Sequence, residues 1–216
     1  AEQVAEEIRH RYGRDAAHAI AIDITQKDSI QAALNQGVSL CGGIDLLINT
    51  AALFPASADN TTSPAQWSKT LEINVTANYF LAEAATSIFR EQGLDASIVF
   101  TSSANAVVAK RGSEAYDVSK AAISHLIREL AVSLAPLVRV NGISPATVIR
   151  GSTMFPRERV MASLTKYNIA FDAAASDDDL RNLLAGFYAK RTLTHQPIDP
   201  SDCARAILFL AVPESR

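Results

Sequence analysis

The sequence has little of what marks secreted, membrane-spanning or metal-binding proteins. Its 216 residues include only two cysteines, Cys41 and Cys203, which lie far apart, and four histidines without metal-ligand spacing. We therefore expect no metal site, and we expect both cysteines to be small buried apolar residues in a reducing, cytoplasmic compartment. No uncharged apolar run approaches the roughly 18 residues of a transmembrane helix, which argues against a membrane partner.

A strong charge of one sign is also missing. The net charge is −3 at pH 7, and the lysines and arginines are scattered singly. Such a surface argues against nucleic acid or an anionic membrane as a partner. The hydrophobic fraction of 48% argues against disorder, and the length suits one domain, 1–216, with a substantial core.

Short β-branched runs alternate with longer helical stretches along the chain. We expect strands at 18–24, 44–49, 97–101 and 138–143, and helices at 1–11, 28–40, 64–92, 114–135, 157–167, 176–190 and 203–212. Nearly continuous apolar strands suit a parallel sheet that is covered on both faces. Repeated βα units of this kind predict a doubly wound α/β fold with right-handed crossovers.

Residues 146–200 break this rhythm, because they are too long for an ordinary connection. We expect them to carry their own helices and to form a substrate lid, since they follow the last strand on the ligand-binding edge. The acidic run 177–179 could hold a metal in principle. A helix first turn capped by Ser176 is the favoured interpretation.

Tyr116 and Lys120 form the most informative pattern in the chain. Residues four apart lie on one face of a helix, so the Lys ammonium can lower the pKa of the phenol and make it a useful acid–base group. The pair alone is weak, because five tyrosines and six lysines give it by chance about once in seven chains of this length. Tyr and Lys at this spacing are also common as a packing residue and a solvated one.

The context of the pair strengthens the pattern. Ser102 and Ser103 follow the buried strand 97–101, and ligands of open α/β sheets bind beyond the carboxyl ends of the strands. A serine hydroxyl arriving there could hold a substrate oxygen beside the phenol. The residues thus predict an apparatus that interconverts an alcohol and a carbonyl.

With these residues assembled, the chain resembles the short-chain dehydrogenase/reductase family over nearly its whole length. The resemblance implies a Rossmann-like fold and a catalytic set of Asn74, Ser103, Tyr116 and Lys120. Tyr116 would be the general acid/base, Lys120 would lower its pKa and bind the nicotinamide ribose, Ser103 would orient the substrate, and Asn74 would hold a water in a proton relay. Two alternatives stay open: Ser102 could face the cleft, and Asn74 could merely interrupt its helix.

The resemblance also implies a cofactor, NAD or NADP with NAD slightly preferred, and a small carbonyl or alcohol substrate. Cofactor contacts are expected, besides Tyr116 and Lys120, from Asp23, Ile24, Asn49, Ala51, Ala52, Pro145, Ala146 and Val148. The chain departs from the family where Thr50 and Ala52 replace an asparagine and a glycine, and where Ala146 replaces a glycine. Each added Cβ costs little where φ is negative and more where φ is positive.

The family's first and last strands are missing from the sequence, together with the Gly-rich turn that cradles the pyrophosphate. We expect the chain to be an internal portion of a longer polypeptide that would by itself bind dinucleotide poorly. A rival interpretation follows, in which the chain is a non-catalytic, dehydrogenase-like binding or assembly module. The complete catalytic set argues for the enzyme.

Two narrower expectations also come from resemblance. Segments 148–152, 167–169 and 187–193 resemble the dehydrogenase part of bifunctional rhamnulose-1-phosphate aldolase/short-chain dehydrogenase proteins, which implies oxidation of a small aldehyde such as lactaldehyde in deoxysugar catabolism. Helices 64–92 and 114–135 are apolar on more than one face, and family members pair them in homodimers or homotetramers. Deeper burial within one chain is the alternative to such pairing.

Overall fold

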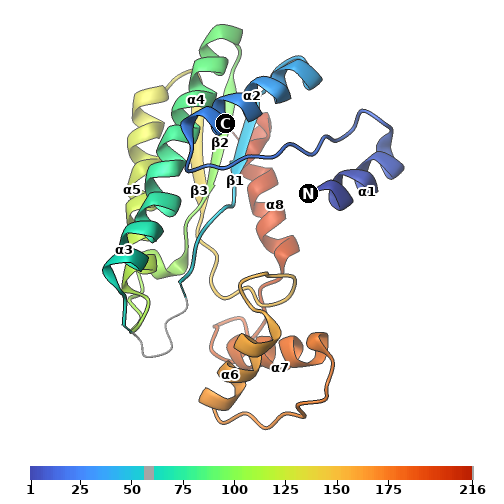
Figure 1. Ribbon diagram of the computed structural model, residues 1–216, viewed down its shortest axis with the longest axis vertical. Helices are drawn as coiled ribbons and strands as arrows, with labels where there is room; N and C mark the ends of the chain where they lie inside the picture. The colour runs from blue at the N-terminus through green and yellow to red at the C-terminus, as the bar shows by residue number, and fades with distance from the viewer. Residues whose placement is uncertain (56–60, 216) are drawn as a thin grey trace.

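A three-stranded parallel sheet forms the centre of the computed structural model, which describes residues 1–55 and 61–215 (Figure 1). The strands β1 (Leu46–Asn49), β2 (Ala96–Thr101) and β3 (Val138–Ile143) lie in the order β1-β2-β3, with Ile98 opposite both Leu47 and Val140. Strand β2 is buried from Ala96 to Phe100, as its continuous apolar sequence predicts. Leu46 and Ile48 on β1 are exposed, so the sheet is fully covered only over its middle.

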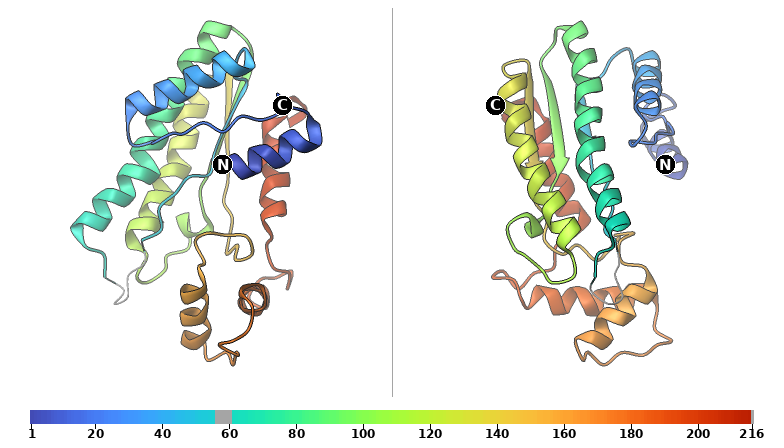
Figure 2. Two further views of the ribbon diagram at one scale, coloured as in Figure 1. Left: turned by 45° about the vertical axis from the view of Figure 1, so that its right-hand side comes forward. Right: turned by 60° about the vertical axis from the view of Figure 1, so that its left-hand side comes forward.

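Helices cover both faces of the sheet, which confirms the predicted doubly wound α/β fold. Helices α2 (Lys27–Cys41), α4 (Ala77–Gln92) and α5 (Glu114–Leu134) line one face, and α8 (Pro200–Ala211) lies on the other (Figure 2). The main core lies between the sheet and the first group, and it includes Ile30, Leu81, Phe89, Ile98, Phe100 and Ile123. Helix α1 (Glu2–Tyr12) precedes α2, as predicted within one residue at each end.

The predicted helix 64–92 forms, and it contains one π-helical turn. Ser63 begins α3 (Pro64–Leu71) with a capping box: its hydroxyl accepts from the Gln66 N–H while the Gln66 side chain bonds the Ser63 N–H. A π-helical turn, Glu72–Thr76, then precedes α4. The predicted bounds of 64 and about 92 are confirmed, and the difference is this wider π-helical turn, in which Asn74 points inward and bonds the backbone of Leu53.

The predicted strand 18–24 does not form. After α1 this segment runs across the sheet rather than alongside β1 (Figures 1 and 2). A strand requires a neighbour for its backbone hydrogen bonds, and no partner strand adjoins this segment among the described residues. Periodicity alone could not supply that neighbour.

Residues 149–189, here called the lobe, lie beyond the carboxyl ends of the strands (Figure 1). The lobe carries α6 (Arg157–Lys166) and α7 (Asp177–Ala189), which confirms that this stretch has its own helices. They share a separate apolar core of Ile149, Val160, Leu164, Leu180, Leu184 and Ala185. A bridge between Val148 and Ile198 closes the base of the insertion.

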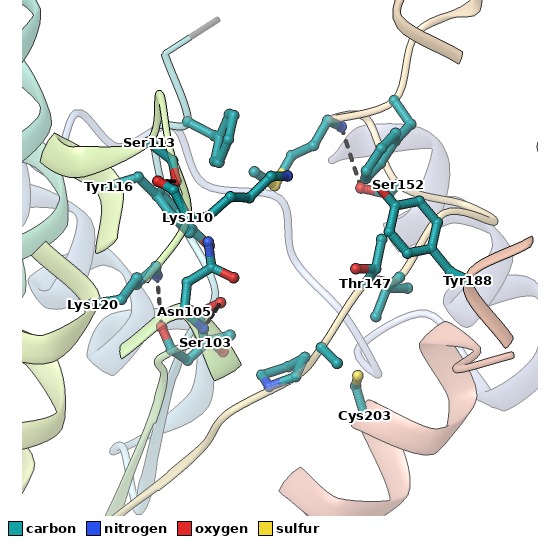
Figure 3. A pocket seen from close by; sticks show the side chains of 18 of the residues that line it. Ser103, Asn105, Lys110, Ser113, Tyr116, Lys120, Thr147, Ser152, Tyr188 and Cys203 are labelled. Atoms are coloured by element: carbon teal, nitrogen blue, oxygen red, sulfur yellow. Dashed lines mark hydrogen bonds between the residues drawn. The ribbon is translucent and has the colours of Figure 1, made fainter. Parts of the chain in front are cut away.

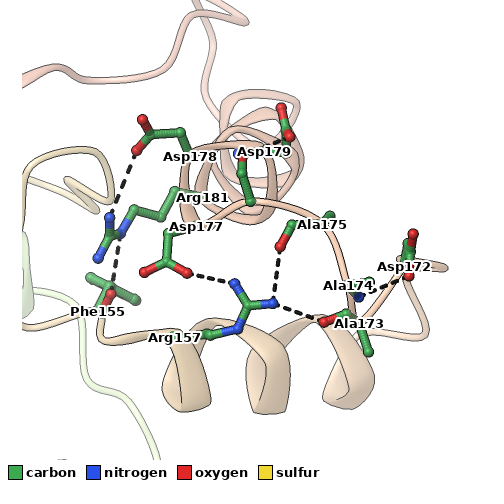
Figure 4. Close-up of polar contacts among 11 residues, drawn as sticks. Phe155, Arg157, Asp172, Ala173, Ala174, Ala175, Asp177, Asp178, Asp179 and Arg181 are labelled. Atoms are coloured by element: carbon green, nitrogen blue, oxygen red, sulfur yellow. Dashed lines mark hydrogen bonds and ion pairs between the residues drawn. The ribbon is translucent and has the colours of Figure 1, made fainter.

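Polar contacts fix the two lobe helices to each other (Figure 4). Arg157 of α6 pairs with Asp177 and donates to the carbonyls of Ala173 and Ala175. Ser176 accepts from the Asp179 N–H at 3.1 Å, as predicted for a helix N-cap. The acidic run is therefore used in capping and ion pairing.

Both cysteines differ from their predicted burial. Cys41 is exposed because it ends α2 at the solvent side, and Cys203 is only partly buried because the first turn of α8 borders a cavity. No helix within the described residues is long and apolar enough to span a membrane.

Phe89 provides a test of the main core. It is 0% exposed, so Phe89→Ala should lower the free energy of unfolding by about 3–5 kcal/mol through lost burial and a cavity. Leu193→Ala, at a fully exposed position outside helices 64–92 and 114–135, should change it by less than about 0.5 kcal/mol. Urea denaturation of both variants checks this, and equal losses would contradict the assigned core.

Candidate active site

A cavity of about 870 Å³ lies where the strand ends, the start of α5 and the lobe meet (Figure 3). Ser103 reaches it from the end of β2, and Tyr116 and Lys120 reach it from the first turns of α5. Pro145 to Val148, which follow β3, form another wall. The structure thus brings together three of the four predicted catalytic side chains at the edge where ligands of parallel sheets bind.

The Tyr116 phenol is buried beside Ser103. Burial raises its pKa above the ordinary value, while a hydrogen bond from Ser103 and the charge of Arg159 lower it in part. The sequence led us to expect a pKa lowered by Lys120, and the structure differs in both direction and cause. The phenol is therefore held in its protonated form at neutral pH.

Lys120 is only 3% exposed and lies behind the phenol. Its Nζ donates to the Thr101 carbonyl at 2.8 Å and lies 5.5 Å from the centre of the Tyr116 ring. Burial lowers the Lys120 pKa to about 8, because the charged form loses hydration. The ammonium is thus near the phenol but is directed to the end of β2.

The two candidate serines are distinguished by their hydrogen bonds. Ser102 Oγ donates to the Lys120 carbonyl at 2.9 Å and lies 2.7 Å from Ser124 Oγ, so it fastens β2 to α5. Ser103 Oγ instead accepts from the Asn105 N–H at 3.2 Å and lies near enough to the Tyr116 phenol to lower its pKa. This geometry favours Ser103 over Ser102 as the residue that meets a substrate.

Asn74 lies in the π-helical turn, 1% exposed, and it does not line the cavity. Its amide bonds the Leu53 backbone twice, at 2.7 and 2.9 Å, and donates to Ser119 Oγ at 2.9 Å. Ser119 Oγ in turn donates to the Tyr116 carbonyl at 2.7 Å. The side chain therefore holds α5, which carries Tyr116 and Lys120, to the segment after β1.

Asn78 extends this chain of hydrogen bonds. It accepts from Asn49 Nδ2 at 2.6 Å and donates to the Asn74 carbonyl at 2.9 Å, inside the protein. Asn49, predicted to contact the cofactor, is instead committed to Asn78 and to the Ala51 N–H. Asn49, Asn74, Asn78 and Ser119, here called the buried network, link the end of β1 to α5.

Asp117, which sequence reasoning did not select, fixes the loop between Ser103 and Tyr116. Its buried carboxylate accepts from Asn105 Nδ2 at 2.7 Å, from the Lys110 N–H at 2.9 Å and from Ser113 Oγ at 2.9 Å. A short hydrophilic stretch before a helix gives no signal for such a clamp. The carboxylate also raises the Tyr116 pKa, after the larger effect of burial.

The predicted cofactor contacts divide into two groups. Ala52, Pro145, Ala146 and Val148 line the cavity together with Tyr116 and Lys120. Asp23, Ile24 and Ala51 do not line it. The Asp23 carboxylate accepts hydrogen bonds from the N–H and hydroxyl of Thr25 and so stabilises the turn that leads into α2. These bonds lower the pKa of Asp23.

No group of three or more potential metal ligands lies together in the part of the chain that the structure describes. What the cavity offers is a buried phenol with a serine hydroxyl and a lysine ammonium nearby. On a Rossmann-like parallel sheet, this arrangement suits the class of sites that carry out acid–base chemistry at an oxygen.

Comparison with known proteins agrees with this class. The model of the family described as enoyl-(acyl carrier protein) reductase matches residues 1–184. The chain belongs to this family, one of the short-chain dehydrogenases/reductases.

Named relatives share this family at modest identity. The uncharacterized oxidoreductase YuxG of Bacillus subtilis is 31% identical over 98% of this chain, which spans 29% of YuxG. Sorbose reductase sou1 of Schizosaccharomyces pombe is 31% identical over 76% of the chain, which spans 66% of that protein. Sorbitol-6-phosphate 2-dehydrogenase SrlD from Erwinia amylovora has the same fold, with a TM-score of 0.85, 19% identity, and coverage of 100% of this chain and 80% of its own.

The buried network predicts a stability loss at Asn78. Asn78→Leu keeps the number and branching of the side-chain heavy atoms but leaves the Asn49 amide and the Asn74 carbonyl without this partner. Each buried polar group left unpaired costs about 1–3 kcal/mol, so we expect a loss of about 2–5 kcal/mol in urea denaturation. Asn182→Leu at an exposed position of α7 is the matched control and should change little. Similar values for the two variants would contradict the network.

Lys120 predicts a pH dependence of stability. Its pKa falls from the ordinary 10.5 to about 8 on folding, so the folded state holds fewer protons between these values and its stability rises with pH there. The burial penalty is constant below pH about 8 and fades above it. The unfolding free energy of the wild type should therefore gain on that of Lys120→Met from pH about 7.5 to about 10. Lys190→Met, at an exposed position that follows α7, is the control, whereas parallel curves for the wild type and Lys120→Met would refute the shift.

Proposed function

We propose that the protein is an NAD(P)-dependent oxidoreductase that interconverts an alcohol or aldehyde and its carbonyl or acid partner. The observation that carries this proposal is the buried Tyr116 phenol, which lines the cavity together with Ser103 from the carboxyl end of β2, with Lys120 Nζ 5.5 Å from the centre of its ring. A phenol and a serine side by side can hold one substrate oxygen between them. Acid–base work at that oxygen is what reduction of a carbonyl or oxidation of an alcohol requires.

Tyr116 is the proposed proton carrier. In reduction the phenol gives its proton to the substrate oxygen, and in oxidation the phenolate takes it back. Burial and, to a smaller extent, the Asp117 carboxylate favour the protonated phenol, whereas Ser103 and the charge of Arg159 favour the phenolate, so these last two offset part of the effect of burial. Asn74 acts in this scheme by holding α5 in place, since its amide is engaged by Leu53 and Ser119.

The cavity supports binding of the nicotinamide end of NAD or NADP. Lys120 offers an ammonium, and Ala52, Pro145, Ala146 and Val148 offer a small apolar wall beside it. When bound, the cofactor supplies or accepts the hydride. NAD stays the slightly preferred prediction. The lobe, which borders the same cavity, is the proposed lid over the substrate.

The substrate is proposed to be a sugar, sugar alcohol or related polyol. The sorbose reductase relative supports this class, and hydroxyl groups of Ser152, Tyr167 and Tyr188 line the lobe side of the cavity. Oxidation of lactaldehyde stays a narrower hypothesis that draws no support from the relatives. A substrate panel in which kcat/KM for lactaldehyde exceeds that for polyols would support the lactaldehyde hypothesis.

We further propose association as a homodimer or homotetramer through helices 64–92 and 114–135. Apolar side chains on these elements are exposed in the single chain: Trp67, Tyr79, Val118 and Val132. Covering them would remove apolar surface from water.

Tyr116→Phe separates the enzyme from the non-catalytic module. Removing the phenolic oxygen should lower kcat about 10²- to 10⁴-fold, because the proton carrier is lost, while the Kd for NADH changes by less than about threefold. Turnover is followed by nicotinamide absorbance, and binding by NADH fluorescence. Tyr12→Phe, at an exposed position on α1, is the control and should keep full activity. An unchanged rate in Tyr116→Phe would remove Tyr116 from the mechanism, and nucleotide binding without turnover in the wild type would favour the module.

A further inference from the structure

Positive charge gathers around the cavity of a protein whose net charge is negative. Five cationic side chains line the cavity, and no aspartate or glutamate does so among the described residues: the cations are Lys110, Arg111, Lys120, Arg159 and Lys166. Lys120 belongs to the catalytic set, whereas the other four come from the loop before α5 and from the lobe. A cavity with one sign of charge selects ligands of the opposite sign.

Arg159 is the cation most firmly built into this wall. It lies in the first turn of α6, donates to the Met154 carbonyl at 2.8 Å, and is partly buried. Its guanidinium carbon lies 4.4 Å from the centre of the Phe54 ring and 4.9 Å from that of Phe155. Aromatic contacts and one carbonyl hold the group in a fixed orientation and leave most of its five N–H donors for a ligand.

Other arginines of the insertion have carboxylate partners that Arg159 lacks. Arg150 pairs with Asp199, Arg157 with Asp177, and Arg181 with Asp178. No carboxylate lies within ion-pair distance of Arg159 in the described ranges 1–55 and 61–215. Arg191 is also without one, but it packs on Phe187 and does not line the cavity. A desolvated guanidinium without a counter-ion is the usual receptor for a carboxylate or phosphate.

Arg159 lies at the reacting end of the cavity. The Phe54 ring contacts its guanidinium and also contacts the Tyr116 ring at 4.7 Å between centres. From the opposite wall, the Lys110 side chain extends into the cavity toward Tyr188 (Figure 3). An anion bound by Arg159 would thus lie near an oxygen held by Tyr116, and Lys110 lines the same cavity.

The phosphates of a bound cofactor account for this positive charge less well than an anionic substrate does. The wall proposed for the nicotinamide is formed by Lys120 and residues 145–148, on the strand side of the cavity. Arg159 and Lys166 belong to α6 of the lobe, and Lys110 belongs to the loop before α5. Their place suits the substrate that the lobe would cover.

We propose that the substrate is anionic: a small polyhydroxylated molecule that carries a carboxylate or phosphate group, bound by Arg159 and Lys110 while Tyr116 meets its reacting oxygen. This inference rests on the proposed function and specifies its substrate class. Ser152, Tyr167 and Tyr188 line the same cavity, where Tyr167 and Tyr188 share one hydrogen bond between their hydroxyls and Ser152 Oγ accepts from the Met154 N–H. The remaining hydrogen-bonding capacity of these hydroxyls would serve the other hydroxyls of the ligand. Arg159 is thereby a specificity-determining residue.

The test compares three substrates of one carbon skeleton on the full-length protein: a hexitol, the hexonate and the hexitol phosphate. Arg159→Gln should lower kcat/KM for the preferred anion about 10- to 100-fold, mainly through KM, and should change that for the hexitol by less than about threefold. The better of the hexonate and the phosphate identifies the anionic group. Lys190→Gln, at an exposed position that follows α7 and lies outside the cavity, should leave all three unchanged.

Calorimetric binding of each compound to the NADH complex is measured beside turnover, with Lys110→Gln as a second variant should Arg159→Gln fold poorly. Selective loss of anion binding in either variant supports the inference. Equal binding of hexitol and anions, or a loss confined to NADH binding, overturns it while the proposed oxidoreductase stands. Absence of turnover with every compound, at normal anion binding, would overturn the proposed function and leave the anion site supported.

Discussion

The arrangement of the site depends on a chain of buried hydrogen bonds between the end of β1 and α5. Asn49 bonds Asn78, Asn78 bonds the backbone of the π-helical turn, and Asn74 reaches Ser119, one turn beyond Tyr116. These groups have no access to water that could replace a lost partner, so each enforces the position of the next. Helix α5 is thereby fixed along its axis, and the phenol lies near the carboxyl end of β2, beside Ser103.

Desolvation shapes the chemistry that this placement allows. Burial raises the pKa of Tyr116 and lowers that of Lys120, so each group is pushed toward its neutral form. A ligand or cofactor that neutralises or adds charge near them changes that balance directly. Arg159, which has no carboxylate partner among the described residues, also shifts this balance, because its charge favours the phenolate across the Phe54 ring.

Local sequence signals predicted most of the fold. The capping residues Ser63 and Ser176 gave helix starts, and the apolar run 97–101 gave the central strand, because these signals act within a few residues. The prediction of a strand at 18–24 was wrong because strand pairing depends on residues far away in the sequence. The π-helical turn within helix 64–92 was not predicted, because it depends on a contact between Asn74 and the Leu53 backbone, 21 residues away in sequence. Ser103, Tyr116 and Lys120 could be predicted from their spacing, whereas Asn78, Asp117 and Arg159 owe their roles to contacts made only in three dimensions.

Transfer of isotope tests the central claim, that this cavity supports hydride transfer beside the Tyr116 phenol. A polyol deuterated at the reacting carbon is incubated with the protein and oxidised nicotinamide cofactor, and the reduced cofactor is analysed by mass spectrometry. The account predicts one deuterium per reduced nicotinamide, because the hydride moves directly from carbon to cofactor. Reduced cofactor that carries no label, or label lost to water, would contradict it.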